Sequence, residues 1–262
     1  MLLLLAASLP SLLNGAAPEG CVAAPTPKVN NRANVARATT SPWVESNAAR
    51  YIRKPGDKYC VEAPGKSAAL AAAEAFAFGV TAWIKSADGS ADFDKMLEFL
   101  KSLKTADFAP IANIGVVDDG SAQTAELMNL LSRRNLLYKV VSTPDPKLDV
   151  NVTGPHAADP SAEAYTIRQK LGDQKRLLRL YGSEVVVGQL TGDGTHLRLH
   201  LINYANRPVN GLRVRVLGNY PKATLQAFGI PDAKLGDLTA TAEATEFTLP
   251  ALNEYAVIDL AR

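Results

Sequence analysis

Three features of the sequence predict an α/β domain with a partly parallel sheet, followed by an all-β antiparallel sandwich domain. The first is an alanine-rich helix, and the second is a strand–helix–strand pattern near the middle of the chain. The third is a change near residue 175 to a hydrophobic alternation with a period of two. The chain has 262 residues, 47% of them hydrophobic, so both parts are long enough to bury a core. We therefore expect domains over residues 43–174 and 175–262.

The first 17 residues are predicted to be a signal peptide. An apolar run of about a dozen residues is interrupted by Pro10 and followed by Gly15, Ala16 and Ala17, as in the hydrophobic region and cleavage zone of such peptides. The run is too short to span a bilayer. No Lys or Arg precedes it, which leaves a membrane-associated remnant as the alternative. We expect a secreted or periplasmic protein without a membrane span after removal of the signal.

Residues 18–42 are predicted to form a linker or surface arm. They mix Pro, Asn, Thr and Ala without periodicity, so no regular structure is assigned to them. The only two cysteines of the chain are Cys21 in this segment and Cys60 beyond it. In an oxidising compartment they could form one bridge, and two unrelated thiols are the alternative.

The first half of the α/β region starts with a predicted helix from about Lys66 to Phe78, which stops at Gly79. A short buried strand follows in the sequence VTAWIKS. The next segment, ADFDKMLEFLKSLK, places apolar residues at helical spacing and therefore predicts a helix with one core-facing stripe.

Residues 111–142 predict a βαβ unit with parallel strands. An apolar strand leads through an Asp-Asp-Gly-Ser turn into an amphipathic helix and a second apolar strand. Ligands of such sheets bind at the carboxyl ends of the strands, which makes Asp118, Asp119 and Ser121 candidates. The alternative, which we favour, is that these side chains cap the following helix. The turn lacks the G-x-G-x-x-G spacing of dinucleotide sites, and no cofactor is predicted.

Residues 175–262 predict about seven short strands of a β-sandwich, after a helix from Asp159 to Leu171 that joins the two parts. One face of the alternating strands is apolar and is expected to point inward; it comprises Leu197, Leu199, Leu201, Leu212, Val214 and Val216.

The opposite face carries His196, Arg198, His200, Arg213 and Arg215, and we expect it to be solvated. His196 and His200 lie about 13 Å apart along one strand, too far to share a metal ion, so no metal site is predicted. The basic stripe has few interleaved aromatic residues and the net charge is only +2, which argues against a nucleic-acid partner.

The order of these parts resembles the non-barrel portion of bacterial glycoside hydrolases. A strand ending in LHLINY, a GNYP turn and a final EYAVIDL strand are similar to the β-sandwich at the C-terminus of many such enzymes. The segment from AEAFAFGVTAWI to VVSTPD resembles the glutamine-amidotransferase-like, flavodoxin-type domain that precedes the sandwich in some of them. The resemblance covers residues 64–262 and implies a role in carbohydrate recognition.

Two departures from this family limit what the resemblance implies. A catalytic (β/α)8 barrel takes about 250 residues, and about 45 residues lie between the predicted signal peptide and the first helix. No cysteine stands in the strand-to-helix turn at residues 117–121, so we expect no amidotransferase activity.

The sequence supports three functional hypotheses. The first is a carbohydrate-binding or accessory protein, with Trp43, Asn47 and Arg50, beside Glu45, as the best binding residues, and Asp118 and Asp119 as further ligand-binding candidates. Core packing is the alternative role of Trp43.

The second is a compact glycosidase, in which Glu45 and Glu74, or Asp118 or Asp119 in place of Glu74, act as acid and base or nucleophile. Glu74 lies on the alanine-rich helix, so burial is expected to raise its pKa. The third is a structural protein that assembles as a homo-oligomer.

Overall fold

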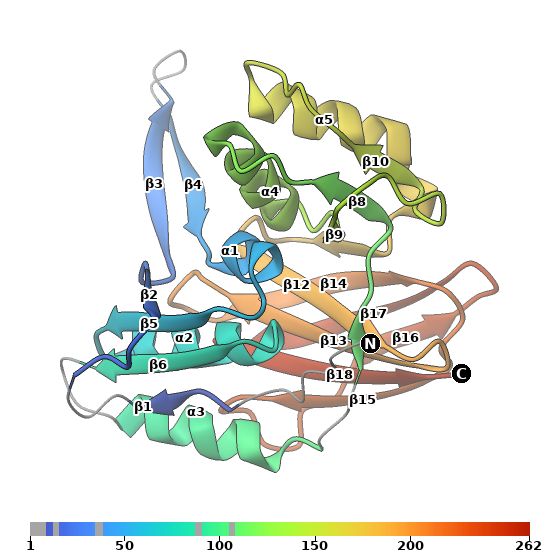
Figure 1. Cartoon of the computed structure of the whole chain (residues 1–262). Coiled ribbons are helices and arrows are strands. Elements are labelled where there is room, and N and C mark those ends of the chain that lie inside the picture. The colour runs from blue at the N-terminus through green and yellow to red at the C-terminus, as the bar shows by residue number, and fades with distance from the viewer. Residues whose placement is uncertain (1–8, 13–15, 35–38, 87–90, 105–107) are drawn as a thin grey trace.

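The computed structural model describes residues 9–12, 16–34, 39–86, 91–104 and 108–262 (Figure 1). In this view one parallel sheet with its helices lies to the left of a two-layered antiparallel sandwich and a second lies above it, and a long hairpin extends away from the body. The expected combination of an α/β region and a β-rich region is therefore present. The predicted domain boundaries stay predictions.

The first parallel sheet has the strand order β1-β6-β5-β2. Its strands are β1 (Ser11–Leu12), β2 (Cys21–Ala24), β5 (Lys58–Ala63) and β6 (Thr81–Ser86). Helices α2 (Gly65–Ala77) and α3 (Ala91–Ser102) accompany it, as the sequence predicts for both helices. The predicted signal peptide lies partly outside the described residues, and its described part includes β1, which pairs with β6.

Residues 18–42 contain more regular structure than the sequence predicts. Strand β2 pairs with β5, and β3 (Lys28–Asn34) pairs with β4 (Thr39–Glu45) in the antiparallel hairpin that reaches away from the body in Figure 1. A disulfide joins Cys21 to Cys60 and so ties β2 to β5. Of the two alternatives expected for Cys21 and Cys60, a bridge or two unrelated thiols, the structure contains the bridge.

The second parallel sheet has the order β10-β8-β9 and confirms the predicted βαβ unit. Strand β8 (Ile114–Val117) leads through α4 (Ala122–Arg133) to β9 (Tyr138–Val141). Strand β10 (Val150–Val152) pairs on the other side of β8, and α5 (Pro160–Leu171) follows it. A short helix, α1 (Ala48–Arg53), packs beside α4.

The sandwich consists of a four-stranded and a five-stranded antiparallel sheet. Their orders are β11-β14-β17-β16 and β15-β18-β13-β12-β7. The strands are β7 (Ala109–Pro110), β11 (Leu178–Tyr181), β12 (Val186–Gly192), β13 (His196–Asn203), β14 (Val209–Leu217), β15 (Lys222–Ala227), β16 (Gly236–Ala240), β17 (Ala244–Leu252) and β18 (Tyr255–Ala261). The predicted inward leucines and valines all lie in the core between the two sheets.

The prediction of a solvated face on β13 is wrong for two of its three residues. His196 is exposed, but Arg198 and His200 are only 5% exposed. Helix α2 packs on this outer face of the five-stranded sheet, because its surface is apolar all round and needs cover on both sides. The ring of Phe76 on α2 meets the ring of His200, with 6.2 Å between centroids. The outer face of this sheet is therefore a second core.

Candidate functional site

The outer face of the four-stranded sheet carries polar side chains in two rows that follow from the strand register. Arg179, Arg215, Glu246 and Thr239 pair in sequence across β11, β14, β17 and β16. The second row contains Tyr181, Arg213 and Thr248, and it ends at Gly236, which has no side chain. Because paired residues of neighbouring strands point to the same face, each row is a line of adjacent side chains.

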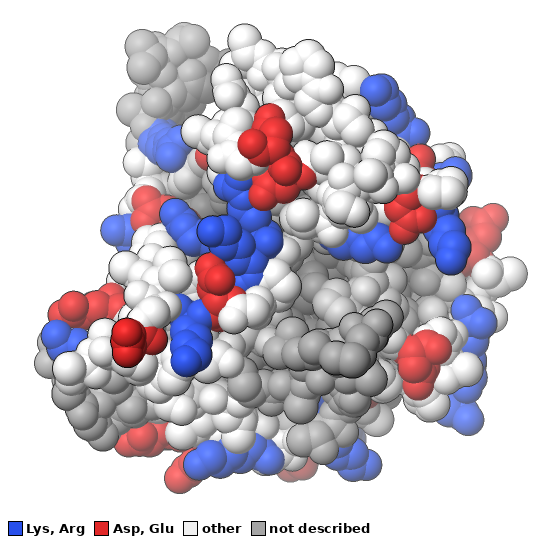
Figure 2. Space-filling model, in the orientation of Figure 1, with Lys and Arg blue, Asp and Glu red and all other residues white. Residues whose placement is uncertain are grey.

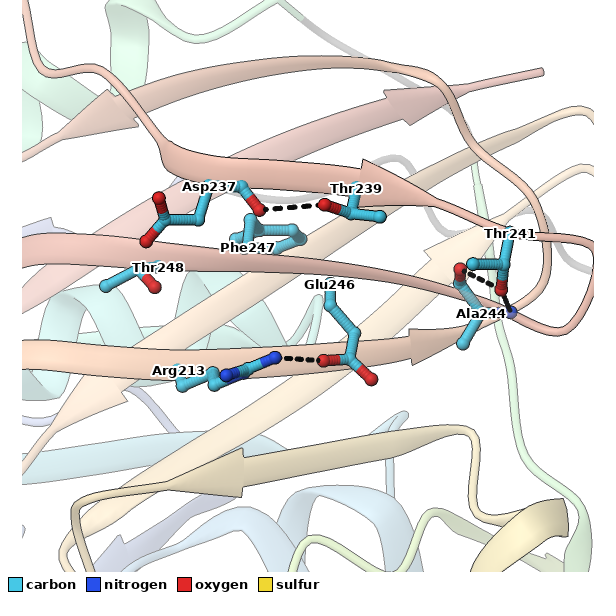
Figure 3. Close-up of a pocket in the computed structure, with 8 residues that line it drawn as sticks. All are labelled: Arg213, Asp237, Thr239, Thr241, Ala244, Glu246, Phe247 and Thr248. Atoms are coloured by element: carbon cyan, nitrogen blue, oxygen red, sulfur yellow. Dashed lines mark hydrogen bonds and ion pairs between the residues drawn. The ribbon is translucent and has the colours of Figure 1, made fainter.

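A cavity of about 380 Å³ opens on this face (Figure 3). It is lined by Arg213 of β14, by residues of β16 and β17 and by the turn between them: Asp237, Thr239, Thr241, Ala244, Glu246, Phe247 and Thr248. Figure 3 shows the guanidinium of Arg213 donating a hydrogen bond to the carboxylate of Glu246, at 2.6 Å. The walls thus combine hydroxyl groups with charged groups, which can donate hydrogen bonds to a polyhydroxylated ligand and accept them from it.

Tyr181 places an exposed aromatic ring beside this cavity. It is 39% exposed and stands opposite Arg213 in the register of β11 and β14. The guanidinium of Arg179 lies 5.2 Å from the centroid of its ring. An aromatic ring next to hydrogen-bonding groups can cover the apolar face of a sugar while the polar groups meet its hydroxyls.

Glu74, predicted to take part in catalysis, is fully buried and saturated with hydrogen bonds. Its Oε1 accepts from the Ser46 hydroxyl at 2.6 Å, the Asn47 backbone N–H at 2.7 Å and the Tyr204 hydroxyl at 2.7 Å. Burial raises the pKa of Glu74, as the sequence predicts, and these hydrogen bonds oppose the rise. The network ties α2, the start of α1 and the sandwich together.

Glu45 has other partners than Glu74. Its carboxylate accepts a hydrogen bond from the Asn30 amide and lies 3.6 Å from the ammonium group of Lys28. Both partners are on β3, across the hairpin from β4. The Glu45 carboxylate is therefore held by residues of β3. The Glu74 carboxylate is held by Ser46, Asn47 and Tyr204.

Trp43 offers no free ring face to a sugar, and Asn47 is buried. The guanidinium carbons of Arg32 and Arg133 lie 3.6 and 3.7 Å from the centroid of the Trp43 ring. Two such groups fit only on opposite sides of the ring, so both ring faces are covered. Asn47 is 0% exposed and its amide donates to Pro25 and Glu74.

Arg50 is exposed on α1, where Figure 2 shows Lys and Arg side chains gathered in the middle of one face with acidic side chains beside them. Its guanidinium reaches the Asn47 side-chain oxygen at 3.5 Å. The mixture of signs agrees with the small net charge of the chain.

Asp118 and Asp119 form hydrogen bonds within the turn before α4 and with the end of α1. The guanidinium of Arg53 donates two hydrogen bonds of 2.6 Å to Asp118 and lowers the pKa of that carboxyl. A hydrogen bond from the Thr124 hydroxyl, joined by one from the Ser121 backbone N–H, lowers the pKa of Asp119. Ser121 is the N-cap of α4. Ser121 and Asp119 thus agree with the capping interpretation, whereas Asp118 pairs with Arg53 of α1.

In the part of the chain that the structure describes, no group of three or more His, Cys, Asp or Glu side chains is placed to hold a metal ion. None of the described helices is long and apolar enough to cross a membrane.

The sequence interpretation did not single out Tyr181, Arg213 or Glu246 as site residues. The available signal was the alternation in RLLRLY and LRVRV, which places Arg179, Tyr181, Arg213 and Arg215 on outward positions. What the alternation does not show is which outward face stays open.

No protein-family model matches the sequence, and no curated protein matches it either. Among solved structures, the chain is similar to α-L-fucosidase isoenzyme 2 from Paenibacillus thiaminolyticus, with a TM-score of 0.57 and 8% identity. The match covers 81% of this chain and 62% of the fucosidase chain, so less than two thirds of that structure is spanned. At this identity the likeness shows the fold alone.

Two further structures are more distant, each with a TM-score of 0.25. One is a cycloisomaltooligosaccharide glucanotransferase from Paenibacillus sp., complexed with cycloisomaltoheptaose, at 14% identity over 55% of this chain and 27% of that chain. The other is a GH30 endoxylanase from Clostridium papyrosolvens C71, at 9% identity over 89% of this chain and 76% of that chain. None of the three structures is described as an amidotransferase, and that part of the resemblance stays a prediction.

Proposed function

We propose that this protein binds carbohydrate on the outer face of its four-stranded sheet and does not cleave it. The observation that carries the proposal is the exposed ring of Tyr181 beside a cavity walled by Arg213, Glu246 and threonine hydroxyls. The cavity volume of about 380 Å³ lies within the range of small-ligand sites, roughly 300–1,000 Å³. The fold it shares with a fucosidase makes a saccharide the first ligand class to test.

The burial of Glu74 argues against hydrolysis by the carboxylates that the sequence analysis paired, Glu45 and Glu74. Glycoside hydrolysis takes two carboxyl groups about 5–10 Å apart that both reach the glycosidic bond. Glu74 is 0% exposed and its oxygens accept hydrogen bonds from Ser46, Asn47 and Tyr204, so a substrate has no path to it.

A compact glycosidase is the second candidate because Asp237 and Glu246 line the same cavity. The ion pairs of Glu246 argue for a binding role. Its carboxylate meets Arg213 at 2.6 Å and Arg215 at 3.7 Å, so each of its two oxygens is already paired with a guanidinium group of the same sheet face. The two functions are separated by assaying the products of any bound glycan.

The disulfide between Cys21 and Cys60 supports the proposed location outside the cytosol. Disulfides persist in secreted and periplasmic proteins and are rare where thiols are kept reduced. The location is tested by fractionating expressing cells and trapping free thiols before lysis.

A glycan array on the oxidised, purified chain tests the binding function, followed by calorimetry with each saccharide that binds. Tyr181→Ala should weaken the affinity about tenfold, the effect of losing one aromatic contact of roughly 1.4 kcal/mol. Tyr165→Ala is the matched control, because Tyr165 is a 57% exposed tyrosine on α5. Equal affinity in both variants would place the glycan elsewhere, and release of reducing ends that Glu246→Gln abolishes would replace binding by hydrolysis.

A further inference from the structure

Next to the cavity, three arginines share a single carboxylate. Arg168, Arg176 and Arg179 come from α5, the start of the sandwich and β11, and all three approach Asp173. The nitrogen–oxygen distances are 3.4, 3.6 and 3.6 Å, longer than the 2.7–2.9 Å typical of a charge-assisted hydrogen bond. One carboxylate therefore does not satisfy the three guanidinium groups around it.

The strand register adds a fourth arginine to this arginine cluster. Arg215 of β14 stands directly opposite Arg179 of β11, and like charges in such a pair repel each other. Arg215 is only 11% exposed, and its nearest acidic partner, Glu246, is also paired with Arg213. The cluster thus holds more positive than negative charge, and three of its guanidinium groups are largely buried.

Unused hydrogen-bond donors accompany the excess charge. The Nε of Arg176, the Nε of Arg179 and the Nη1 of Arg215 are buried and have no hydrogen-bond partner. Buried polar groups without partners cost free energy, and such groups in a native protein call for an explanation. Burial, joined by the neighbouring charge of Arg168, lowers the pKa of Arg176, which reports the same lack of compensation.

The cluster is continuous with the proposed glycan site. Arg179 lies over the ring of Tyr181, and Arg215 meets Glu246, which lines the cavity. The side chain of Asp173 is 44% exposed, so the centre of the cluster is open to solvent on one side. A ligand that rests on Tyr181 can therefore reach the guanidinium groups with a substituent.

Given the proposed carbohydrate-binding function, on which this step rests, we infer that the preferred glycan is acidic and that its carboxylate or sulfate group binds among Arg176, Arg179 and Arg215. Such an anion supplies the negative charge that the cluster lacks and offsets the repulsion between the opposed charges of Arg179 and Arg215. It competes with the carboxylate of Asp173 for the same donors.

Three polysaccharides with one backbone test this inference by calorimetry on the full chain. Dextran is neutral, carboxymethyl dextran carries carboxylates and dextran sulfate carries sulfate groups. At low salt, one or both charged forms should bind about tenfold more tightly than dextran, the effect of one added charge-assisted contact. Sodium sulfate alone tests whether the free anion binds without a sugar, and single-stranded DNA tests whether any polyanion binds.

Four variants assign the effect to the cluster. Arg179→Gln should remove most of the preference for the charged form, and Asp173→Asn should strengthen its binding several-fold because the competing carboxylate is gone. Strengthened binding cannot result from loss of the fold. Arg207→Gln removes an exposed arginine outside the cluster and is the charge-matched control, which should stay within about twofold. Tyr181→Ala should weaken neutral and charged forms alike.

The outcomes separate this inference from the proposed function. Equal binding of dextran and its charged forms, or weaker binding by the Asp173→Asn variant, overturns the acidic ligand and leaves carbohydrate binding standing. Binding of free sulfate or of DNA as tight as that of the charged dextrans, unaffected by Tyr181→Ala, also overturns it. If no saccharide binds in the array or in calorimetry, the proposed function fails first.

Discussion

The burial of His200 should lower the stability of the protein in acid, and the substitution His200→Gln should remove this effect. Its ring lies between Phe76 of α2 and Tyr255 of β18, and Nδ1 is 2.6 Å from the Tyr255 hydroxyl. Burial, with a smaller contribution from the charge of Arg198, lowers the pKa of His200 from 6.5 to about 3.

The magnitude follows from the two pKa values. Below pH 6.5 the unfolded chain takes up a proton on His200, whereas the folded protein leaves it neutral down to about pH 3. The contribution to stability is therefore complete above pH 6.5 and is lost as the pH falls toward 3. At pH 4.5, two units below the unfolded value, the loss is about 2.7 kcal/mol at roughly 1.36 kcal/mol per unit.

Urea unfolding of the wild type and of His200→Gln at pH 7.5 and 4.5 measures this loss. Glutamine keeps a hydrogen-bonding group near Tyr255 but does not titrate. The drop in unfolding free energy between the two pH values should be about 2.7 kcal/mol smaller in the variant. His196→Gln, which removes a histidine with a 58% exposed side chain from the same strand, is the control and should follow the wild type. If His200→Gln also follows the wild type, His200 is not buried against α2 and the packing described above is wrong.

Three further outcomes are expected from the described contacts. Replacing Cys21 and Cys60 by serine opens a loop of 39 residues and should lower the free energy of unfolding by about 4 kcal/mol. Calorimetry should then show a fall in Tm of roughly 8–16 °C, and a fall below about 2 °C would contradict the structural role of the bridge. Glu74→Ala leaves the Asn47 backbone N–H and one hydroxyl of the Ser46–Tyr204 pair without an acceptor and should cost at least ~3 kcal/mol in urea unfolding, and a near-neutral effect would contradict the network. Burial raises the pKa of Glu74, so the folded protein holds this proton to higher pH than the unfolded chain, and stability falls as the pH rises above 4.5. In urea unfolding at pH 4.5 and 7.5, Glu74→Gln should lack this fall. The same dependence of stability on pH in wild type and variant would refute the raised pKa.

The elements of the fold were largely visible in the sequence because their signals are local. Helix α2 runs from Gly65 to Ala77, close to the prediction of 66–78, because alanine favours the helix and Gly79, at a φ of 65°, ends it. The inward leucines of β13 follow from the period of two alone. Residues 18–42 lack such a pattern, and β2 and the β3–β4 hairpin are stabilised by partners far along the chain.

The candidate site was less predictable because it depends on which faces are covered. The alternation that puts Leu199 inward puts His200 outward, and only the packing of α2 decides that this outer face is buried. Ile202 and Tyr204, on the same side as His200, were the available signal for that burial. The same alternation puts Tyr181 outward on a face that stays open. Trp43 had the expected chemistry for a sugar, but Arg32 and Arg133 cover its ring.

Hydroxyl-radical footprinting measures the exposure of single side chains and so locates the bound glycan. With saturating dextran sulfate bound to the oxidised chain, we expect Tyr181 to be protected from oxidation while Tyr165 reacts as in the free protein. Unchanged oxidation of Tyr181 in the complex, or protection of Trp43 in its place, would show that the glycan does not bind the outer face of the four-stranded sheet.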